Sequence, residues 1–543
     1  MRRLIHIILA LFALSLFLTT TRAQTQPAVS KVWVADRDDG TYKNPVLHAD
    51  FSDPDAVRVG EDFYMTASSF NSIPGLPILH SKDLVNWSLV GYALRRQPPF
   101  EVFDKPQHGN GVWAPSIRYH EGEFYIYYPD PDRGIYVVKA KDAAGPWSEP
   151  VLVKEAKGWI DPCPLWDDDG RAYLVTGVAA SRSGVKSILV VSRMSPDGMR
   201  LLDDGVLVFD GHDRNPTVEG PKFYKRNGYY YIFAPAGGVE TGWQLALRSK
   251  NVFGPYEERT VLAQGKTPVN GPHQGAWVET QTGESWFLHF QDKGPYGRVV
   301  HLQPMKWAND WPVMGVDPDG DGTGEPVLTY KRPNVGRTWP IATPPDSDEF
   351  DAPGLGLQWQ WHANAQPNWA FPAGPLGYLR LFNTPLPEGY KNLWDVPNLL
   401  LQKFPAEEFT ATTKLTFTPR TDEEKTGLLV MGMDYAYISV EKRPEGLFVS
   451  QFVCKDADKG SAERLGMRLP LKGNTVYLRV RVSAYAIANF SYSTDGEKFT
   501  LLGEPFNAKQ GRWIGAKVGL FASRVGKTRE YGYADFDWFR FEK

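Results

Sequence analysis

Cysteine is almost absent from this chain. Its 543 residues include only Cys163 and Cys454, which stand far apart in the sequence. Two cysteines cannot form the disulfide frameworks that stabilise small exported domains. A chain of this length can instead bury more than one hydrophobic core. We therefore expect two or three domains that are stabilised by packing.

An excess of charge of one sign is also missing. The chain has 60 Lys and Arg residues against 63 Asp and Glu residues, so its formal net charge is −3. Without a basic excess there is no electrostatic reason to expect binding to nucleic acid or to an anionic membrane surface. We therefore expect no nucleic-acid partner.

A long apolar run occurs only at the N-terminus. Arg2 and Arg3 precede an apolar stretch from Leu4 to Leu18, and a small residue follows at Ala23. This pattern predicts a signal peptide (residues 1–23) that is cleaved after Ala23. An uncleaved anchor is the alternative, but a run of about 15 residues is short of the about 20 that span a bilayer. We expect an exported protein, periplasmic or extracellular, that is not inserted in a membrane after cleavage.

Long amphipathic helical patterns are lacking, whereas one hairpin pattern recurs five times. Each copy has an apolar strand, a tight turn with glycine and a second strand that begins with aromatic residues. The copies are VRVGEDFYM (57–65), IRYHEGEFYIYY (117–128), LWDDDGRAYLV (165–175), FYKRNGYYYIF (223–233) and WVETQTGESWFLHF (277–290). Their spacing of about 50–60 residues is that of a four-stranded propeller blade. We expect an all-β chain with a five-bladed β-propeller over residues 44–330; a large sandwich with similar hairpins is the alternative.

The same position precedes each hairpin. Four residues before the first apolar residue stand Asp53, Trp113, Asp161, Glu219 and His273. Equivalent positions on the innermost strands form a ring at one mouth of the channel, so the three carboxylates should converge. Any one of them alone would be read as a turn or loop residue. Three together indicate function, because like charges at a partly dry site repel and do not help folding.

Cleavage of a glycosidic bond requires such a set of carboxyl groups. One carboxylic acid protonates the leaving oxygen, and one carboxylate activates water or attacks directly. A third carboxylate can keep the acid protonated and in place. The ring predicts glycoside hydrolysis; a propeller that binds sugar without cleaving it is the alternative.

Four segments resemble glycoside hydrolase family 43, the five-bladed xylosidases and arabinofuranosidases. They are NPVLHADFSDPDAVRVGEDFYMTASSF, NGVWAPSIRYHEGEFYIYY, GWIDPCPLWDDDGRAYLV and VEGPKFYKRNGYYYIFAPAGG. The resemblance extends from about Asn44 to about Pro326 and continues into an appended β-sandwich. It implies that Asp53 is the general base that activates water, that Glu219 is the general acid, and that Asp161 tunes and orients the acid. It also implies inversion of the anomeric configuration.

The resemblance further implies binding residues. Phe70 and Trp113 would line the sugar subsite, because a pentose offers apolar C–H faces to aromatic rings. Arg298 matches an arginine that binds sugar hydroxyls, although a surface salt bridge is the ordinary interpretation. No cofactor is required. His273 matches an axial histidine that often binds calcium, and a structural Ca²⁺ there would be held mainly by water.

A second candidate for calcium lies in DPDGDGTGE (317–325). Asp317, Asp319 and Asp321 stand as at the start of a calcium loop, but Leu328 occupies the twelfth position, where a bidentate Glu belongs. We expect an acidic turn that closes the propeller.

A Pro-rich connector, residues 331–349, is expected to link the propeller to a second domain. Residues 350–543 show the strand patterns of a concanavalin-like β-sandwich, with a clear hairpin turn at Ser493–Gly496. This domain should pack on the propeller and lend a loop to the mouth of the site; a free-standing carbohydrate-binding module is the alternative. Lys517 stands where some of the two-domain xylosidases that the chain resembles have a phenylalanine that closes the pocket, so we expect a more open or more polar mouth. Such a mouth speaks against a strict fit to short xylo-oligosaccharides and favours a branched polymer.

The predicted protein is an exported, exo-acting, inverting hydrolase that follows a short N-terminal extension (residues 24–43). It would remove terminal α-L-arabinofuranosyl or β-D-xylosyl residues, with a slight preference for arabinofuranose. Its partners would be plant cell-wall polysaccharides or oligosaccharides such as arabinoxylan, xyloglucan, arabinan or xylo-oligosaccharides.

Overall fold

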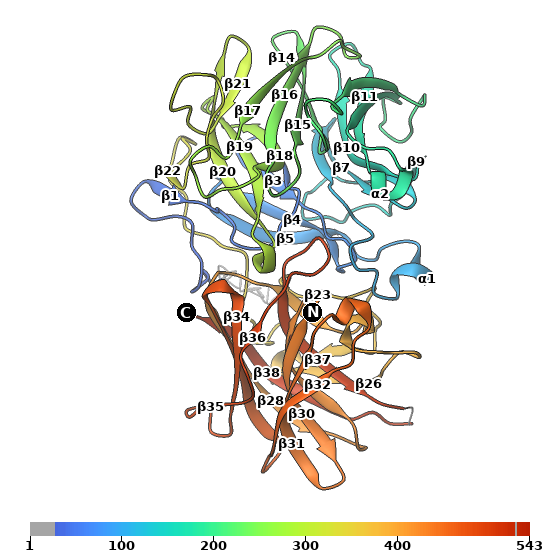
Figure 1. The fold of residues 1–543 in the computed structure, drawn as a ribbon, viewed down its shortest axis with the longest axis vertical. Coiled ribbons are helices and arrows are strands. Elements are labelled where there is room, and N and C mark those ends of the chain that lie inside the picture. Colours follow the sequence, from blue (N-terminus) through green and yellow to red (C-terminus); the bar gives the residue numbers. More distant parts are fainter. Residues whose placement is uncertain (1–27, 527–528) are drawn as a thin grey trace, which may run out of the picture.

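The computed structural model describes residues 28–526 and 529–543 as two stacked domains of β-sheet (Figure 1). The expected signal peptide and the start of the N-terminal extension lie outside the described residues. No helix in the described part is long and apolar enough to cross a membrane. The all-β prediction is confirmed, because the helical elements of that part are single turns: α1 (Phe100–Phe103), α2 (Ala180–Ser183), η1 (Gly294–Tyr296), η2 (Gly374–Leu376), η3 (Leu393–Asp395), η4 (Ala457–Lys459) and η5 (Ala484–Ala486).

Five antiparallel four-stranded sheets form the propeller, as predicted. Blade 1 contains β2 (Asp55–Val59), β3 (Asp62–Thr66), β4 (Gly75–Ser81) and β5 (Trp87–Leu94). Blade 2 contains β6 (Ser116–His120), β7 (Glu123–Asp130), β8 (Gly134–Ala140) and β9 (Val151–Glu155). Blade 3 contains β10 (Trp159–Trp166), β11 (Ala172–Val178), β12 (Ile188–Met194) and β13 (Val206–Asp210).

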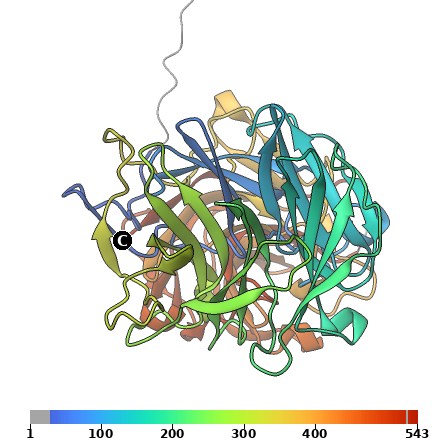
Figure 2. The ribbon, with the colours of Figure 1, turned by 90° about the horizontal axis from the view of Figure 1, so that it is seen from above.

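Blade 4 contains β14 (Lys222–Arg226), β15 (Tyr229–Ala236), β16 (Trp243–Ser249) and β17 (Glu257–Leu262). Blade 5 contains β18 (His273–Glu279), β19 (Ser285–Asp292), β20 (Arg298–Ala308) and β21 (Trp311–Met314). The first strand of each blade is innermost, and β18 contacts β2, which closes the ring. Figure 2 shows this ring from above, with the second domain behind it.

The five predicted hairpins are the first two strands of the five blades. Their turn glycines, Gly60, Gly122, Gly170, Gly228 and Gly283, all have φ values between 63° and 87°. Such left-handed turn positions favour glycine because other residues pay a steric cost there. The turn chemistry visible in the sequence therefore corresponds to the real turns.

The chain before blade 1 pairs with blade 5 and with the strand that follows it. β1 (Thr41–Lys43) pairs with β22 (Thr329–Lys331), which follows blade 5. Leu47 and Val300 exchange backbone hydrogen bonds of 3.3 and 3.1 Å, so the entering chain lies on β20. Each blade consists of four consecutive strands, and these contacts join the two ends of the propeller.

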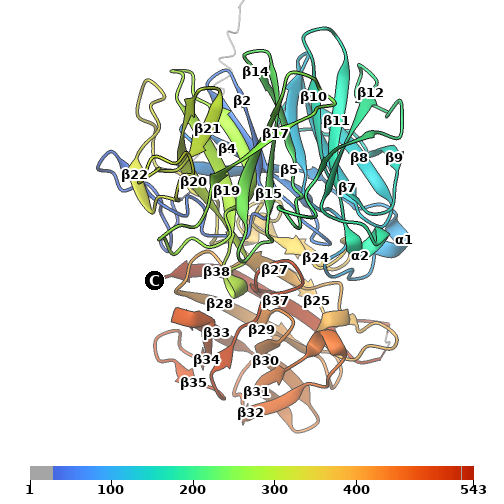
Figure 3. The same ribbon diagram turned by 45° about the horizontal axis from the view of Figure 1, so that its top comes forward.

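The second domain is a sandwich of two antiparallel-rich sheets (Figure 3). One sheet contains β23 (Gln360–Trp361), β26 (Thr384–Pro385), β27 (Leu400–Lys403), β29 (Lys425–Met431), β30 (Tyr435–Arg443), β31 (Gly446–Cys454), β32 (Arg464–Pro470) and β37 (Lys517–Arg524). The other contains β24 (Ala370–Pro372), β25 (Leu379–Phe382), β28 (Phe409–Thr418), β33 (Thr475–Ser483), β34 (Ile487–Ser493), β35 (Thr500–Leu501), β36 (Phe506–Asn507) and β38 (Tyr533–Glu542). A single apolar core lies between the sheets.

The two domains share backbone hydrogen bonds. Ile73 and Trp361 exchange bonds of 3.1 and 2.6 Å, and the Ala516 N–H donates to the Pro295 carbonyl at 2.7 Å. Cys163 and Cys454 are buried and free. The described residues therefore contain no disulfide, and that packing stabilises the chain stays a prediction.

Candidate active site

The predicted ring converges at one end of the propeller channel. A cavity of about 120 Å³ opens there, lined by Asp53, Phe70, Trp113, Ala114, Ile160, Asp161, Glu219, Val239, Gln274, Arg298 and Trp513. Six of the seven site residues predicted from the sequence line it. The seventh, His273, lies behind the cavity and contacts Glu219.

Irregular backbone aims two of the carboxylates into the cavity. Asp53 has a φ of 54° and stands just before β2, while Asp161 has a φ of 56° inside β10. The pairing of β10 with β11 shifts between Ile160 and Cys163, so Asp161 sits in a bulge. Bulges redirect side chains, and left-handed non-glycine residues cost free energy that is usually retained at functional sites.

Three donors hold the Asp53 carboxylate. The hydroxyls of Ser52 and Ser68 donate to Oδ2 at 2.7 and 2.6 Å. The Arg298 guanidinium donates to Oδ1 at 3.1 Å and also reaches the Ser52 hydroxyl at 2.9 Å. Arg298 is buried, and its Nε has no hydrogen-bond partner. Arg298 therefore both orients Asp53 and faces the cavity.

Asp161 is the most deeply placed of the three carboxyl groups. It is almost fully buried, and its Oδ2 accepts a hydrogen bond from the Gly220 N–H at 2.7 Å. Burial raises the pKa of Asp161 well above its usual value, and the charges of Glu219 and Asp53 act in the same direction. The Gly220 N–H opposes this shift. Gly220 directly follows Glu219, so Asp161 fixes the backbone that carries Glu219.

Among the described residues the Glu219 side chain forms one hydrogen bond, of 3.1 Å, between its Oε1 and Nε2 of His273. The Glu219 side chain is 29% exposed, whereas His273 is 1% exposed. Glu219 is therefore supported from behind and open toward the cavity. The other ring nitrogen of His273, Nδ1, is buried without a partner.

The surroundings of His273 fit a calcium ion poorly. The protein offers ring nitrogens there, whereas Ca²⁺ prefers six to eight oxygen ligands. The carboxylate that contacts His273 belongs to Glu219, which already faces the cavity. Calcium binding at His273 stays a prediction.

Aromatic rings from three segments form the cavity wall. Backbone hydrogen bonds of 2.8 and 3.1 Å join Phe70 to Val112, which places Phe70 beside Trp113. The Trp113 indole donates to the Gly109 carbonyl at 2.8 Å. Trp513, from the loop before β37, meets Trp113 edge-on with ring centres 6.5 Å apart. The sandwich thus lends a loop to the mouth, as expected.

The structure corrects the role expected for Lys517. This residue is only 4% exposed, and its ammonium group donates to the Ser72 hydroxyl under the domain interface. It does not line the cavity. Trp513, four residues earlier, occupies the mouth instead. The mouth is therefore narrowed by an aromatic ring and is not opened by a lysine.

Sequence reasoning missed Gln274 and Trp513. Gln274 follows His273 at a bulge in β18, has a φ of 40°, and is 3% exposed with its amide Nε2 unpartnered. Hairpin spacing identified position 273, but the bulge turns the next side chain into the cavity. Trp513 could not be found from local sequence, since its place in the cavity depends on how the two domains dock.

The acidic turn also appears where it was expected. Asp317, Asp319 and Asp321 bring their carboxylates within 4.8 Å of one another, and two of the three are exposed. Asp317 accepts hydrogen bonds from the N–H groups of Gly320 and Gly322 at 2.7 and 2.9 Å. Local turn formation accounts for this cluster.

A buried ionic network lies deeper in the channel. Asp55 of blade 1 forms a 2.7 Å ion pair with Arg118 of blade 2. The ammonium group of Lys222, from blade 4, is 4.0 Å from Asp55 and donates to the Pro115 carbonyl and the Ser116 hydroxyl at 2.8 Å each. The Lys222 charge acts against the raised pKa of Asp161. The network joins three blades directly beneath the carboxylates.

Comparisons with known proteins agree with this architecture. The model of glycosyl hydrolases family 43 matches residues 42–312, and that of the beta-xylosidase C-terminal concanavalin A-like domain matches residues 347–542. A protein of Xylanibacter ruminicola is 41% identical over 508 residues, covering 92% of this chain and 89% of its own. The beta-xylosidase of Formosa agariphila is 32% identical, covering 93% and 91%.

Two further relatives span both domains. The non-reducing end alpha-L-arabinofuranosidase of Bacteroides ovatus is 30% identical and covers 92% of this chain and 94% of its own. The crystal structure of xylan beta-1,4-xylosidase from Bacillus halodurans superimposes with a TM-score of 0.81 at 28% identity, covering 92% and 100%. The concanavalin-like fold of the second domain and the glycosidase activity predicted from the carboxylate ring are confirmed, with a polysaccharide or oligosaccharide as the class of substrate. The chain belongs to glycoside hydrolase family 43.

Proposed function

We propose that this protein is an exo-acting, inverting pentosidase that removes terminal β-D-xylosyl or α-L-arabinofuranosyl residues from plant hemicellulose. The observation that carries the proposal is the small cavity in which Asp53 and Glu219, from blades 1 and 4, face a space walled by aromatic rings. Two carboxyl groups that face one space suit the attack of water on one side of a bond and protonation on the other.

In the proposed reaction the terminal sugar lies against Phe70 and Trp113. Asp53 removes a proton from a water molecule as that water attacks the anomeric carbon. Glu219 donates a proton to the leaving oxygen, so each turnover consumes one water and restores both groups after proton exchange with solvent. Asp161 acts on Glu219 through the Gly220 backbone and through its charge. No covalent intermediate forms.

We propose a xylosyl residue as the first substrate and an arabinofuranosyl residue as the second. Lys517 was the residue expected to open the mouth, which spoke against a close fit to short xylo-oligosaccharides, and its burial removes that objection. The names of the relatives in Formosa agariphila and Bacteroides ovatus support one sugar each. We also propose export to the periplasm or the medium, on the strength of residues 1–23.

Release of sugar from the 4-nitrophenyl glycosides of β-D-xylopyranose and α-L-arabinofuranose tests the proposal. We expect hydrolysis of one or both, with the first-formed product of inverted configuration by proton NMR. Asp53→Asn should reduce turnover of these glycosides by about 10⁴-fold while sugar binding is kept. Glu219→Gln should reduce turnover of a xylo-oligosaccharide by about 10²–10⁴-fold, because its leaving hydroxyl, unlike nitrophenolate, has to be protonated. Glu279→Gln, at the exposed end of β18, is the matched control and should be fully active. Unchanged turnover of the xylo-oligosaccharide in Glu219→Gln would refute the assignment.

A further inference from the structure

A second hollow lies on the rim of the propeller, apart from the catalytic cavity. It encloses about 350 Å³. One wall is the end of β5 with the residues after it, Tyr92–Arg96 and Phe100. The other wall is the loop between β8 and β9, Ala144–Pro150. The two segments lie close together, since a side chain on Gly91 would come within 3.3 Å of the Ala144 carbonyl. The rim hollow therefore spans blades 1 and 2.

The rim hollow combines aromatic surface with unpaired charge. Phe100 is 43% exposed, and the half-buried Trp147 is anchored by its indole N–H, which donates to the Ala143 carbonyl at 3.0 Å. Within the described residues, the side chains of Arg95 and Glu149 form no hydrogen bond or ion pair. One free guanidinium and one free carboxylate leave the hollow nearly neutral.

This chemistry suits a carbohydrate better than a charged partner. Sugar rings offer apolar C–H faces that pack on aromatic rings, and their hydroxyls accept from a guanidinium and donate to a carboxylate. A nucleic acid or an acidic peptide would require a basic surface, and Glu149 offsets Arg95. Arg96 is already engaged, since it lies 4.0 Å above the Phe100 ring and pairs with Asp104 at 3.0 Å.

The rim hollow reaches the face of the propeller on which the catalytic cavity opens. Strands alternate in direction within a blade, so the end of β5 lies on the same side as the beginning of β2, where Asp53 stands. By the same alternation the loop between β8 and β9 leaves blade 2 on the opposite side, so the hollow runs along the rim and its Leu94–Phe100 end is the part that reaches this face. Helix α1 then leads from Phe100 to Phe103, and Phe103 lies against Gly111, two residues before Trp113. Figure 3 shows α1 on the propeller beside the domain junction.

The size of the catalytic cavity indicates what could bind in the rim hollow. The catalytic cavity, about 120 Å³, is far smaller than pockets for drug-sized ligands, which measure about 300–1,000 Å³. It admits the end of a glycan, so the rest of a long substrate must lie on the surface outside. We propose that the rim hollow binds the uncleaved part of a polysaccharide substrate, several sugars away from the scissile bond. This inference rests on the proposed function and adds that the natural substrate is polymeric.

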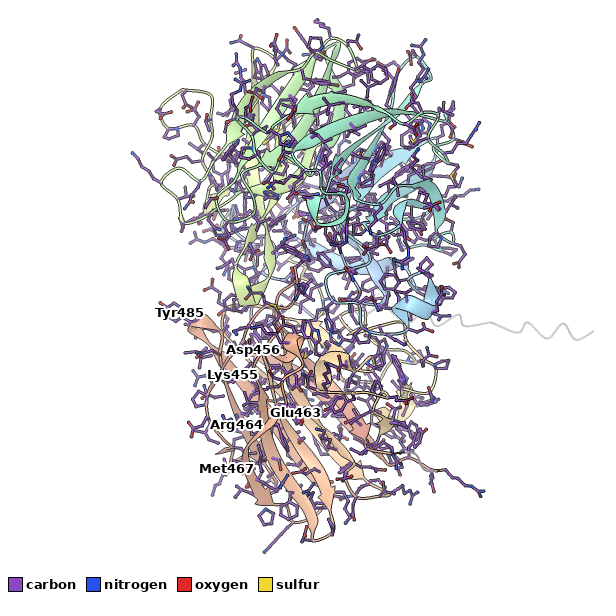
Figure 4. All side chains as sticks on the ribbon, turned by 45° about the vertical axis from the view of Figure 1, so that its right-hand side comes forward. Lys455, Asp456, Glu463, Arg464, Met467 and Tyr485 are labelled. Carbon is purple, nitrogen blue, oxygen red and sulfur yellow. The ribbon has the colours of Figure 1, made fainter. Side chains whose placement is uncertain are left out.

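Parallel kinetics on short and long substrates test the proposal. The Arg95→Ala/Phe100→Ala double variant should keep the parent kcat/KM on the nitrophenyl glycosides, because neither residue lines the catalytic cavity. On arabinoxylan we expect KM to rise about tenfold, as is typical for the loss of important contact residues. Tyr485→Ala is the matched control: this aromatic residue is 90% exposed on the sandwich, before β34, on the opposite side of the domain junction from α1 (Figures 1 and 4).

Binding without turnover separates this proposal from the proposed function. In a Glu219→Gln background, arabinoxylan cast in a native gel should retard the protein, and the double variant should lose most of that retardation. Equal retardation and equal arabinoxylan kinetics in the parent and the double variant would overturn the proposal. If the parent fails to cleave either nitrophenyl glycoside, the proposed function fails, and the gel still decides whether the rim hollow binds the polymer.

Discussion

At the scale of single residues, the carboxyl group of Asp161 combines burial with two like-charged neighbours. Its pKa is raised above 3.8, so the unfolded chain loses this proton at a lower pH than the folded protein. As pH rises from about 3.8 to the raised pKa, this group costs the fold an increasing amount of free energy, and the cost is constant above that. The site therefore keeps a destabilising group in place.

Asp161→Asn is expected to stabilise the fold and to slow the reaction. An amide removes the buried charge, so the free energy of unfolding at pH 7 should rise by about 1 kcal/mol. Turnover should fall about 100-fold, and the alkaline limb of the rate profile should move to lower pH, because the charge that opposes deprotonation of the acid is gone. Melting curves at pH 3 and pH 7 check the sign: the stabilisation should vanish at pH 3. A lower melting temperature at pH 7 would contradict the argument.

Gln274 is expected to act on substrate and not on stability. Its amide has a buried Nε2 without a partner at the cavity wall, so Gln274→Ala removes no internal hydrogen bond. One lost hydrogen bond to sugar should lower kcat/KM about fivefold to tenfold. Steady-state kinetics and a melting curve of the same preparation separate the two effects. An unaltered kcat/KM would mean that Gln274 does not touch the sugar.

At the scale of strands and blades, the Asp55–Arg118 pair connects β2 to β6 beneath the carboxylates. Asp55 is fully buried and also accepts the Ile117 N–H at 2.8 Å. Asp55→Ala leaves the Arg118 charge buried without this partner, so we expect a loss of about 3–5 kcal/mol in stability by denaturant titration. Glu61→Ala, which breaks an exposed ion pair with Arg337, should leave the titration midpoint unchanged. Equal effects of the two substitutions would show that the buried pair is not holding the blades.

The blades could be predicted because their first two strands carry a local signal. Gly60 and Gly122 mark left-handed turns between apolar and aromatic strands, and that chemistry is visible within ten residues. The bulges could not be predicted. Gln274 enters the cavity because the pairing of β18 with β19 slips by one residue, and pairing register depends on the partner strand. Spacing therefore identified the ring but not each side chain that joins it.

At the scale of the whole molecule, the docking of the two domains determines which residue of the sandwich lines the mouth of the cavity. Trp513 and Lys517 are four residues apart, yet one lines the cavity and the other is buried under the interface. Which of them reaches the mouth depends on how the loop before β37 meets the propeller. The Gly515 N–H donates to Asp50 at 3.0 Å, and a side chain there would come within 2.7 Å of the Gly297 nitrogen. Resemblance alone had pointed to position 517.

The domain interface should make stability depend on pH. Burial, with repulsion from Lys403, lowers the pKa of Lys517 from 10.5 to about 7, and Asp50 acts in the opposite direction. The unfolded chain binds this proton up to pH 10.5 and the folded protein only to about 7, so this group's contribution to stability grows more favourable as pH rises between those values. His108 and His362 lie nearby, and burial lowers the pKa of both.

Lys517→Met should raise the melting temperature more at pH 6 than at pH 9, because the charged lysine is buried at the lower pH. The comparison is made between variant and parent at each pH, so that other titrating groups cancel. Lys472→Met, at an exposed turn, should change neither value. A stabilisation that is the same at both pH values would show that Lys517 does not titrate in this range.

The aromatic wall contributed by the sandwich affects the order in which the active site is assembled during synthesis. Trp513 is synthesised about 460 residues after Asp53, which takes roughly half a minute to a minute and a half at about 5–20 residues per second. A propeller that folds as it leaves the ribosome holds its carboxylates during this interval, but one side of its cavity is still missing. A segment that is made long after the carboxylates therefore completes the cavity that holds them.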